Sequence, residues 1–226
     1  MRKLIIVFFF FLLMDIVIAS TAAAAPPPYP TFSAEEEANL QKGQPVFREE
    51  QFTDAKGHRA GRGVAYLLIN AKPEKIWKSI LDYDHYKEFY PNVHTAKLTK
   101  KENDHLYVFF ILDVVGIMKI KYNVDHTFHA QDNRLTWKMD QTKKNDFKET
   151  TGFWQIWPRP DGTSLVCYSV YVETGRWVPG FLQKAVDKIG LTTWGLKKVV
   201  TCMKKRAEMG KAYQGEPDRK LKKDEV

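Results

Sequence analysis

The chain of 226 residues has only two cysteines, Cys167 and Cys202. A fold that depends on disulfides needs more of them, so a hydrophobic core must stabilise this one. Cys167 shares a predicted strand face with Ser169 and Tyr171, and it therefore points away from the long helix that carries Cys202. We expect no disulfide between the two cysteines.

Sequence motifs of several enzyme classes are also missing. The chain has no nucleophile elbow, no phosphate-binding glycine loop and no dinucleotide-binding fingerprint. His126 and His129 lie on one predicted strand but face opposite sides of it. His85 and His94 have no second ligand at metal-binding spacing. We expect neither a metal site nor a cofactor.

Asp82, Asp84 and His85 form a small polar cluster with two interpretations. Such residues can take part in acid–base chemistry, but more often they cap the end of a helix. We expect the capping role.

The charge balance is positive, with 35 basic and 27 acidic residues and a net charge of +8. There is no basic stripe with interleaved aromatic residues and no known nucleic-acid-binding module, so we expect no nucleic-acid partner. A positive charge favours anionic partners, and for an exported protein the nearest polyanion is a membrane surface.

The one long apolar run lies at the N-terminus. Arg2 and Lys3 precede apolar residues 4–14, and small residues follow at 20–24, which is the pattern of a cleavable secretory signal. The run is too short for a comfortable membrane span. We predict a periplasmic or secreted protein. Its segments are a signal peptide over 1–24, a leader over 25–42, one domain over 43–209 and a disordered charged tail over 210–226.

Alternation of bulky and polar residues, clearest from Met118 to His129, predicts a meander of strands. Strands are expected over 46–53, 64–70, 94–101, 104–112, 117–129, 134–140, 147–157 and 164–174. A hairpin turn is expected around Gly57 and Gly61-Arg62-Gly63. Helices are expected from Pro73, over 83–89 and over 179–208, where the period of the apolar residues becomes helical.

This order of elements resembles the START-like (SRPBCC) superfamily, and within it the polyketide cyclase and coenzyme Q-binding branch. The similar segments are Trp77–Asp84, Phe89–Val93, Tyr122, Trp137, Gly152–Trp154 and Trp177–Phe181, within a resemblance that covers residues 43–207. It implies an α+β helix-grip fold, in which a curved antiparallel sheet wraps around a long C-terminal helix and two short helices follow the first hairpin. The superfamily contains lipid carriers, allergens, cyclases and hydrolases, so the resemblance leaves the ligand open.

The predicted concave side of the sheet carries many bulky side chains with polar tips. Such residues suit a mostly apolar pocket that makes a few hydrogen bonds, and the alternative is a filled core whose Tyr and Trp tips reach the rim. The expected cavity residues are Tyr66, Trp77, Phe110, Met118, Ile120, Tyr122, Val124, His126, Trp137, Met139, Trp154, Tyr168, Val170, Leu182, Val186 and Ile189.

Alternate turns of an antiparallel meander share one end of the sheet, so the segments 113–117, 141–145 and 175–180 should meet there. Two of them are apolar, which is unusual for exposed turns, and lysines surround them. We predict a portal that docks on an anionic membrane, formed by Val114, Val115, Ile117, Trp177, Val178, Phe181, Lys143, Lys144 and Arg176. In the alternative, the apolar residues fold inward as a lid or as packing.

Two functions fit these features. The first is a monomeric, exported, non-catalytic protein that binds and transfers a lipid, quinone, sterol-like molecule or other hydrophobic small molecule. The second is a START-like enzyme of the cyclase or aromatase type, with His126, Tyr122 and Tyr168 as acid–base groups. The absence of a catalytic pair and of a cofactor motif favours the first.

Overall fold

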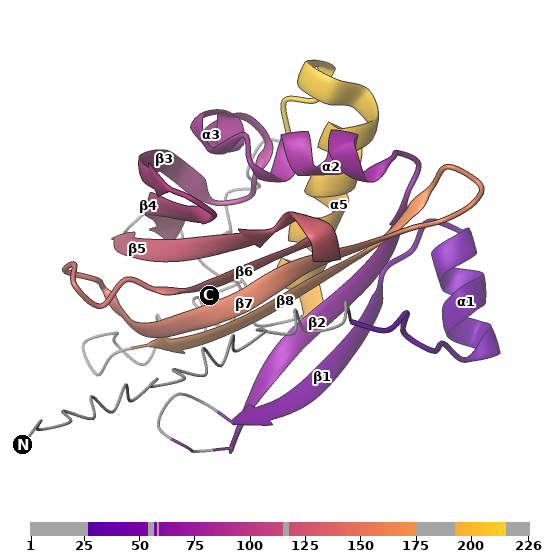
Figure 1. Ribbon diagram of the computed structural model, residues 1–226, viewed down its shortest axis with the longest axis horizontal. Helices are drawn as coiled ribbons and strands as arrows, with labels where there is room; N and C mark the ends of the chain where they lie inside the picture. Colours follow the sequence, from indigo (N-terminus) through magenta and orange to yellow (C-terminus); the bar gives the residue numbers. More distant parts are fainter. Residues whose placement is uncertain (1–26, 54–56, 58, 115–117, 175–192, 216–226) are drawn as a thin grey trace, which may run out of the picture.

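A computed structural model describes residues 27–53, 57, 59–114, 118–174 and 193–215. Within these residues an open antiparallel sheet has the strand order β1-β2-β8-β7-β6-β5-β4-β3 (Figure 1). The strands are β1 Val46–Thr53, β2 Arg59–Ile69, β3 Val93–Glu102, β4 His105–Val114, β5 Met118–His129, β6 Arg134–Met139, β7 Phe147–Pro158 and β8 Ser164–Thr174. Strands β3 to β8 follow one another as an antiparallel meander. Strand β8 also pairs with β2, so the β1–β2 hairpin extends the sheet on the far side of β8.

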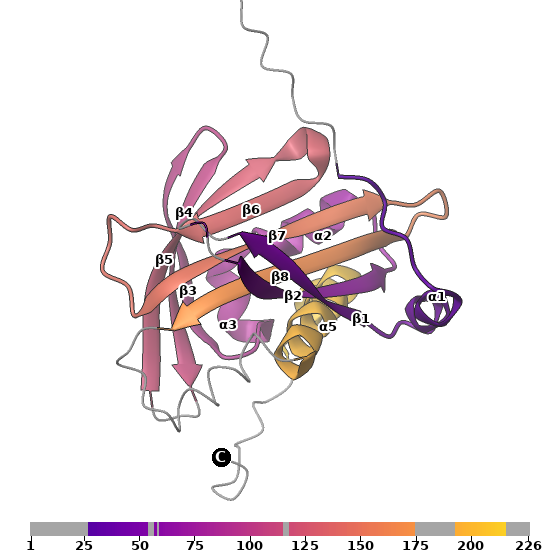
Figure 2. The ribbon, with the colours of Figure 1, turned by 90° about the horizontal axis from the view of Figure 1, so that it is seen from below.

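The helices are short except for the C-terminal one. They are α1 Ala34–Gln41, α2 Pro73–Ile80, the 3-10 turn η1 Tyr83–His85, α3 Tyr86–Phe89, the 3-10 turn η2 Ala130–Asp132, α5 Thr193–Met209 and the 3-10 turn η4 Gly210–Ala212. Pro73 opens α2, where a missing backbone N–H is harmless. Helices α2, α3 and α5 lie on the concave face of the sheet (Figures 1 and 2).

The main core lies between this concave face and the helices. From α5, Leu196, Val199, Val200 and Met203 are buried against the inward residues of β2, among them Leu67. A smaller cluster lies on the convex face, where Leu40 of α1 packs on β1, β2 and β8. The leader segment therefore covers part of the sheet.

The helix-grip fold and the antiparallel meander are confirmed, with strand ends within a few residues of the expected ones. The predicted turn at Gly61-Arg62-Gly63 is wrong, because these residues lie inside β2 and pair with β1. A Cβ on Gly63 would lie 2.7 Å from Leu196 Cδ1, so glycine here allows α5 to approach the strand closely.

Two more segments bear on the sequence predictions. The expected tail starts at Gly210, yet the next residues form η4 and the Tyr213 side chain is buried. The expected long helix is described from Thr193 onward, and residues 179–192 lie outside the described part of the chain. Cys167 is buried in the convex cluster, away from α5, and no disulfide joins it to Cys202.

Candidate functional site

An internal cavity of about 110 Å³ lies between the concave face of β4 to β8 and the η1–α3 segment. Tyr83, Tyr86, Tyr90 and Pro91 of that segment form one wall, and Val199 of α5 contributes at the side. The sheet supplies the opposite wall. The concave face is thus only partly filled by side chains.

Nine of the expected cavity residues line this cavity: Phe110, Ile120, Tyr122, Val124, His126, Trp137, Trp154, Tyr168 and Val170. They come from β4 to β8, where the alternation in the sequence is clear. Sequence reasoning missed the wall formed by Tyr83, Tyr86 and Tyr90. Their spacing of three and four residues places them on one face of a helix. This spacing was the signal from which the wall could have been predicted.

Tyr66 was wrongly assigned to the cavity. It lies on the convex face with Val64 and Leu68, whereas Ala65 and Leu67 face the main core. Strand β2 is buried on both faces because the leader covers its convex side, so its apolar residues do not alternate with polar ones.

Two further assignments also differ from the structure. Trp77 is buried beside the cavity, with its ring against Phe128 and its indole N–H 3.3 Å from Asn133 Oδ1. Met139 is buried, and it lines a separate groove on the sheet and not the cavity. The Met118 side chain and Leu182, Val186 and Ile189 lie outside the described residues.

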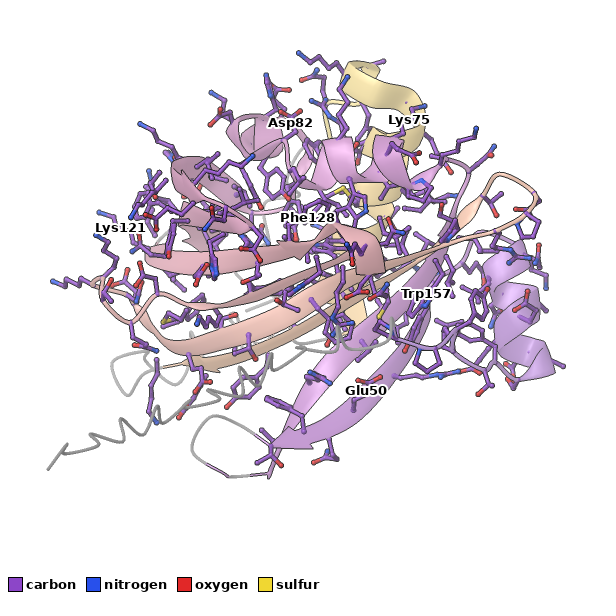
Figure 3. All side chains as sticks on the ribbon, in the orientation of Figure 1. Glu50, Lys75, Asp82, Lys121, Phe128 and Trp157 are labelled. Atoms are coloured by element: carbon purple, nitrogen blue, oxygen red, sulfur yellow. The ribbon has the colours of Figure 1, made fainter. Side chains whose placement is uncertain are left out.

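Most of the predicted portal also lies outside the described residues: the Val114 side chain, Val115, Ile117, Arg176, Trp177, Val178 and Phe181. Lys143 and Lys144 are exposed in the β6–β7 turn. This turn is tied to β5, since Asn123 N donates to Asn145 Oδ1 and Lys121 N donates to Asp146 Oδ2, both at 2.8 Å. Lys121 points into solvent at this end of the sheet (Figure 3).

His126 is the most polar group in the cavity. Its Nδ1 lies 3.3 Å from the Tyr83 hydroxyl, and the two rings stack with centroids 5.5 Å apart. Burial lowers the pKa of His126 to about 3, so the imidazole is neutral at pH 7. If Nδ1 accepts from Tyr83, Nε2 carries the proton and can donate to a ligand.

Most of the remaining polar tips belong to tyrosines, and Thr150, Trp137 and Trp154 supply the others. Burial raises the pKa of Tyr168 to about 12, and a hydrogen bond with Tyr90 lowers it in part. Tyr122 stacks on Phe110 at 5.2 Å, and the Tyr86 hydroxyl donates to the carbonyl of Ile80. No Asp, Glu, Lys or Arg is among the described residues that line the cavity. Such a lining favours an uncharged, largely apolar ligand.

Metal ligation and membrane spanning find no support in the part of the chain that the structure describes. No group of three or more His, Cys, Asp or Glu residues there is arranged to hold a metal ion. None of the described helices has the length and hydrophobicity needed to cross a bilayer. His85 Nδ1 lies 2.6 Å from Asp82 Oδ1, and neither residue lines the cavity.

Three solved structures have the same fold as this chain. An aromatase/cyclase from a Streptomyces species has a TM-score of 0.56 and 10% identity, with 76% of this chain and 100% of that one covered. A STAR-related lipid transfer protein from Xanthomonas axonopodis has a TM-score of 0.53 and 14% identity, covering 71% and 98%. A START superfamily protein from Mycobacterium smegmatis has a TM-score of 0.52 and 15% identity, covering 66% and 97%.

Comparison at the level of sequence gives the family. No curated protein sequence matches the chain. The family model for polyketide cyclases, dehydrases and lipid transport proteins matches residues 67–208, which is more than half of the chain and includes every described residue that lines the cavity. The chain therefore belongs to this polyketide cyclase/dehydrase and lipid transport family, and it shares the fold of the START superfamily protein.

Proposed function

We propose that this protein binds a hydrophobic small molecule or lipid in the internal cavity and carries it without converting it chemically. The observation that supports this function best is the cavity itself, whose described lining has no charged residue and only a few neutral hydrogen-bonding tips. Membership of a family that includes lipid transport proteins agrees with it. The signal-like pattern around Arg2 and residues 4–14 supports export to the periplasm or beyond the cell.

The size of the cavity limits what it holds at once. Sites for drug-sized ligands measure roughly 300–1,000 Å³, whereas this cavity measures about 110 Å³. One ring or the end of an acyl chain fits this space, so the rest of a longer ligand requires a wall of the cavity to move.

Transient docking on an anionic membrane is the second part of the proposal. The cavity extends toward the sheet end where β8 stops, because Leu112, Phe147 and Val172 line it there. Lys121, Lys143 and Lys144 are exposed at the same end. Lysines near a membrane surface contribute about 1 kcal/mol each to binding of anionic lipid. The protein acts as a monomer in this proposal.

A cyclase or aromatase function is the alternative, and the similarity to the Streptomyces enzyme favours it. It would use His126 with Tyr122 and Tyr168. A group with a pKa of about 3 is far from the optimum for proton transfer at neutral pH. This observation favours the carrier over the enzyme.

The carrier hypothesis is tested with matched variants of β8. Val172 lines the cavity, and its neighbour Tyr171 faces the convex side, where its ring meets Phe52. We expect Val172→Trp to weaken binding of the uncharged dye N-phenyl-1-naphthylamine about tenfold, because the indole fills the cavity. Tyr171→Trp should bind the dye as the wild type does, and circular dichroism checks that both variants fold.

Solvent extraction and native mass spectrometry of the wild type should also detect a co-purifying hydrophobic molecule. The carrier hypothesis fails if the wild type binds no dye and carries no such molecule. It also fails if His126→Ala keeps full ligand binding but loses turnover of a polyketide-like substrate, since that result establishes an enzyme.

A further inference from the structure

The internal cavity and an outer groove share one thin wall. The groove measures about 550 Å³ and lies between α3, the start of β3 and one side of α5. Helices α3 and α5 are neighbours in the structure (Figure 2). Tyr90, Pro91 and Val93 line both the cavity and the groove. A single layer of residues therefore separates the two spaces.

This wall is a short link between α3 and β3. Asn92 has a φ of 59°, in the left-handed region that residues other than glycine rarely adopt. Pro91 has no backbone N–H to anchor it. The bond from Val93 N to the Tyr90 carbonyl measures 3.5 Å, which is long for a hydrogen bond. For residues 90–92 to swing outward, the 2.9 Å hydrogen bond from Asp113 N to the Asn92 carbonyl and the stacking of Tyr90 on Tyr86 at 4.7 Å must break.

The groove is charged, unlike the cavity. Lys87 and Lys197 are exposed along it, and Lys198 also lines it. Of its two acidic residues, Glu88 lies 3.4 Å from the buried guanidinium of Arg206, and Asp113 is opposite Lys119 in the β4–β5 register. Arg206 thus already faces the Glu88 carboxylate, and the three lysines outnumber the remaining Asp113, so the groove favours an anion.

We propose that this groove is an outer subsite for the anionic head, a phosphate or carboxylate, of an amphiphile whose apolar part occupies the cavity. The wall formed by residues 90–92 moves aside to join the two spaces. The inference rests on the proposed carrier function and adds a ligand class to it. Cavity and groove together also provide the room that the cavity alone lacks for a lipid-sized molecule.

Two readouts follow the two spaces separately. Displacement of N-phenyl-1-naphthylamine reports on the cavity. The rate at which Cys202 reacts with a thiol reagent reports on the groove, which Cys202 lines. The other cysteine, Cys167, is 1% exposed, and burial raises the pKa of its thiol, so it reacts far more slowly.

Dodecyl phosphate, dodecanol and inorganic phosphate are compared as probes. We expect dodecyl phosphate to displace the dye and to slow the Cys202 reaction at the same concentrations. Dodecanol should displace the dye with little effect on Cys202. Inorganic phosphate at these concentrations should do neither, since the head alone lacks the apolar contribution.

Paired lysine variants then test the subsite. Lys87→Ser/Lys197→Ser should bind dodecyl phosphate at least about tenfold more weakly and dodecanol as before. The control Lys97→Ser/Lys101→Ser removes the same charge from exposed positions of β3 and should leave both affinities unchanged.

Equal binding of dodecyl phosphate by the two lysine pairs, or dye displacement without any effect on Cys202, refutes the subsite but leaves the carrier function intact. Protection of Cys202 by inorganic phosphate alone, equal to that by dodecyl phosphate, also refutes it, because the groove is then unconnected to the cavity. A wild type that binds no hydrophobic probe refutes both proposals.

Discussion

The width of the cavity depends on Gly152, which lies in β7 beneath the ring of Trp137. A Cβ added at this position would lie 2.2 Å from the Ser169 carbonyl oxygen and 2.2 Å from Trp137 Cζ2. Ordinary contact begins at 3.4 Å, so both neighbours would have to retreat by about 1.2 Å. Gly152→Ala is therefore expected to disturb the wall of the cavity directly.

Neither neighbour can retreat easily. The Ser169 carbonyl belongs to β8, which pairs with β7 along its length. The Trp137 ring is already packed against Tyr168 at 5.7 Å and His126 at 5.8 Å, so it can move only into the cavity. Overpacking costs about 1–3 kcal/mol, and alanine recovers about 0.5–1 kcal/mol of backbone entropy. Because one of the clashing atoms is backbone, we expect a net loss near the upper end of this range, about 2 kcal/mol.

Urea unfolding followed by far-UV circular dichroism measures this loss. Gly61→Ala is the matched control, because its Cβ would meet Glu49 Oε1 at 2.6 Å, the end of a flexible side chain. We expect the control to stay within about 0.5 kcal/mol of the wild type. The Gly152 variant should also bind the naphthylamine dye more weakly. Equal stability of the two variants would refute the packing assigned to Trp137.

Three further predictions concern buried polar groups. Stability should fall as the pH drops from about 6.5 toward 3, because His126 takes up its proton near pH 6.5 when unfolded but only near pH 3 when folded. The free energy of unfolding should fall by about 2 kcal/mol between pH 7 and pH 5 because of this group. Urea titrations at these two pH values should show that His126→Gln lacks this contribution. An unchanged slope in the variant contradicts the burial of a neutral imidazole. Tyr83→Phe removes the hydrogen bond to His126 and should cost about 1 kcal/mol in the same assay. Arg206→Met leaves Asp82 and Glu88 without a cation that is now 3.4 Å from each, and since these carboxylates are partly exposed we expect a loss of about 2 kcal/mol. The exposed pair of Lys100 and Glu102 provides the comparison, because Lys100→Met should leave the stability unchanged within the error of the measurement.

The sequence by itself determined the elements that obey a simple period. In β4, β5 and β6 most residues of the convex face are partly or fully exposed, so large apolar and polar side chains alternate and the inward residues could be named. Helix α2 could be predicted from the proline at its first position and from its apolar face. The order of these elements was enough to predict the helix-grip fold.

Only the tertiary structure decided what lies on each side of β2 and at the top of the cavity. Both faces of β2 are apolar, because α5 covers one and the leader with α1 covers the other, so Tyr66 could not be assigned by alternation. The wall of Tyr83, Tyr86 and Tyr90 exists because a short helical segment is held over the sheet, partly through Arg206 from a distant part of the chain. Whether the concave face is filled or hollow depends on such long-range contacts, and local patterns in the sequence do not specify them.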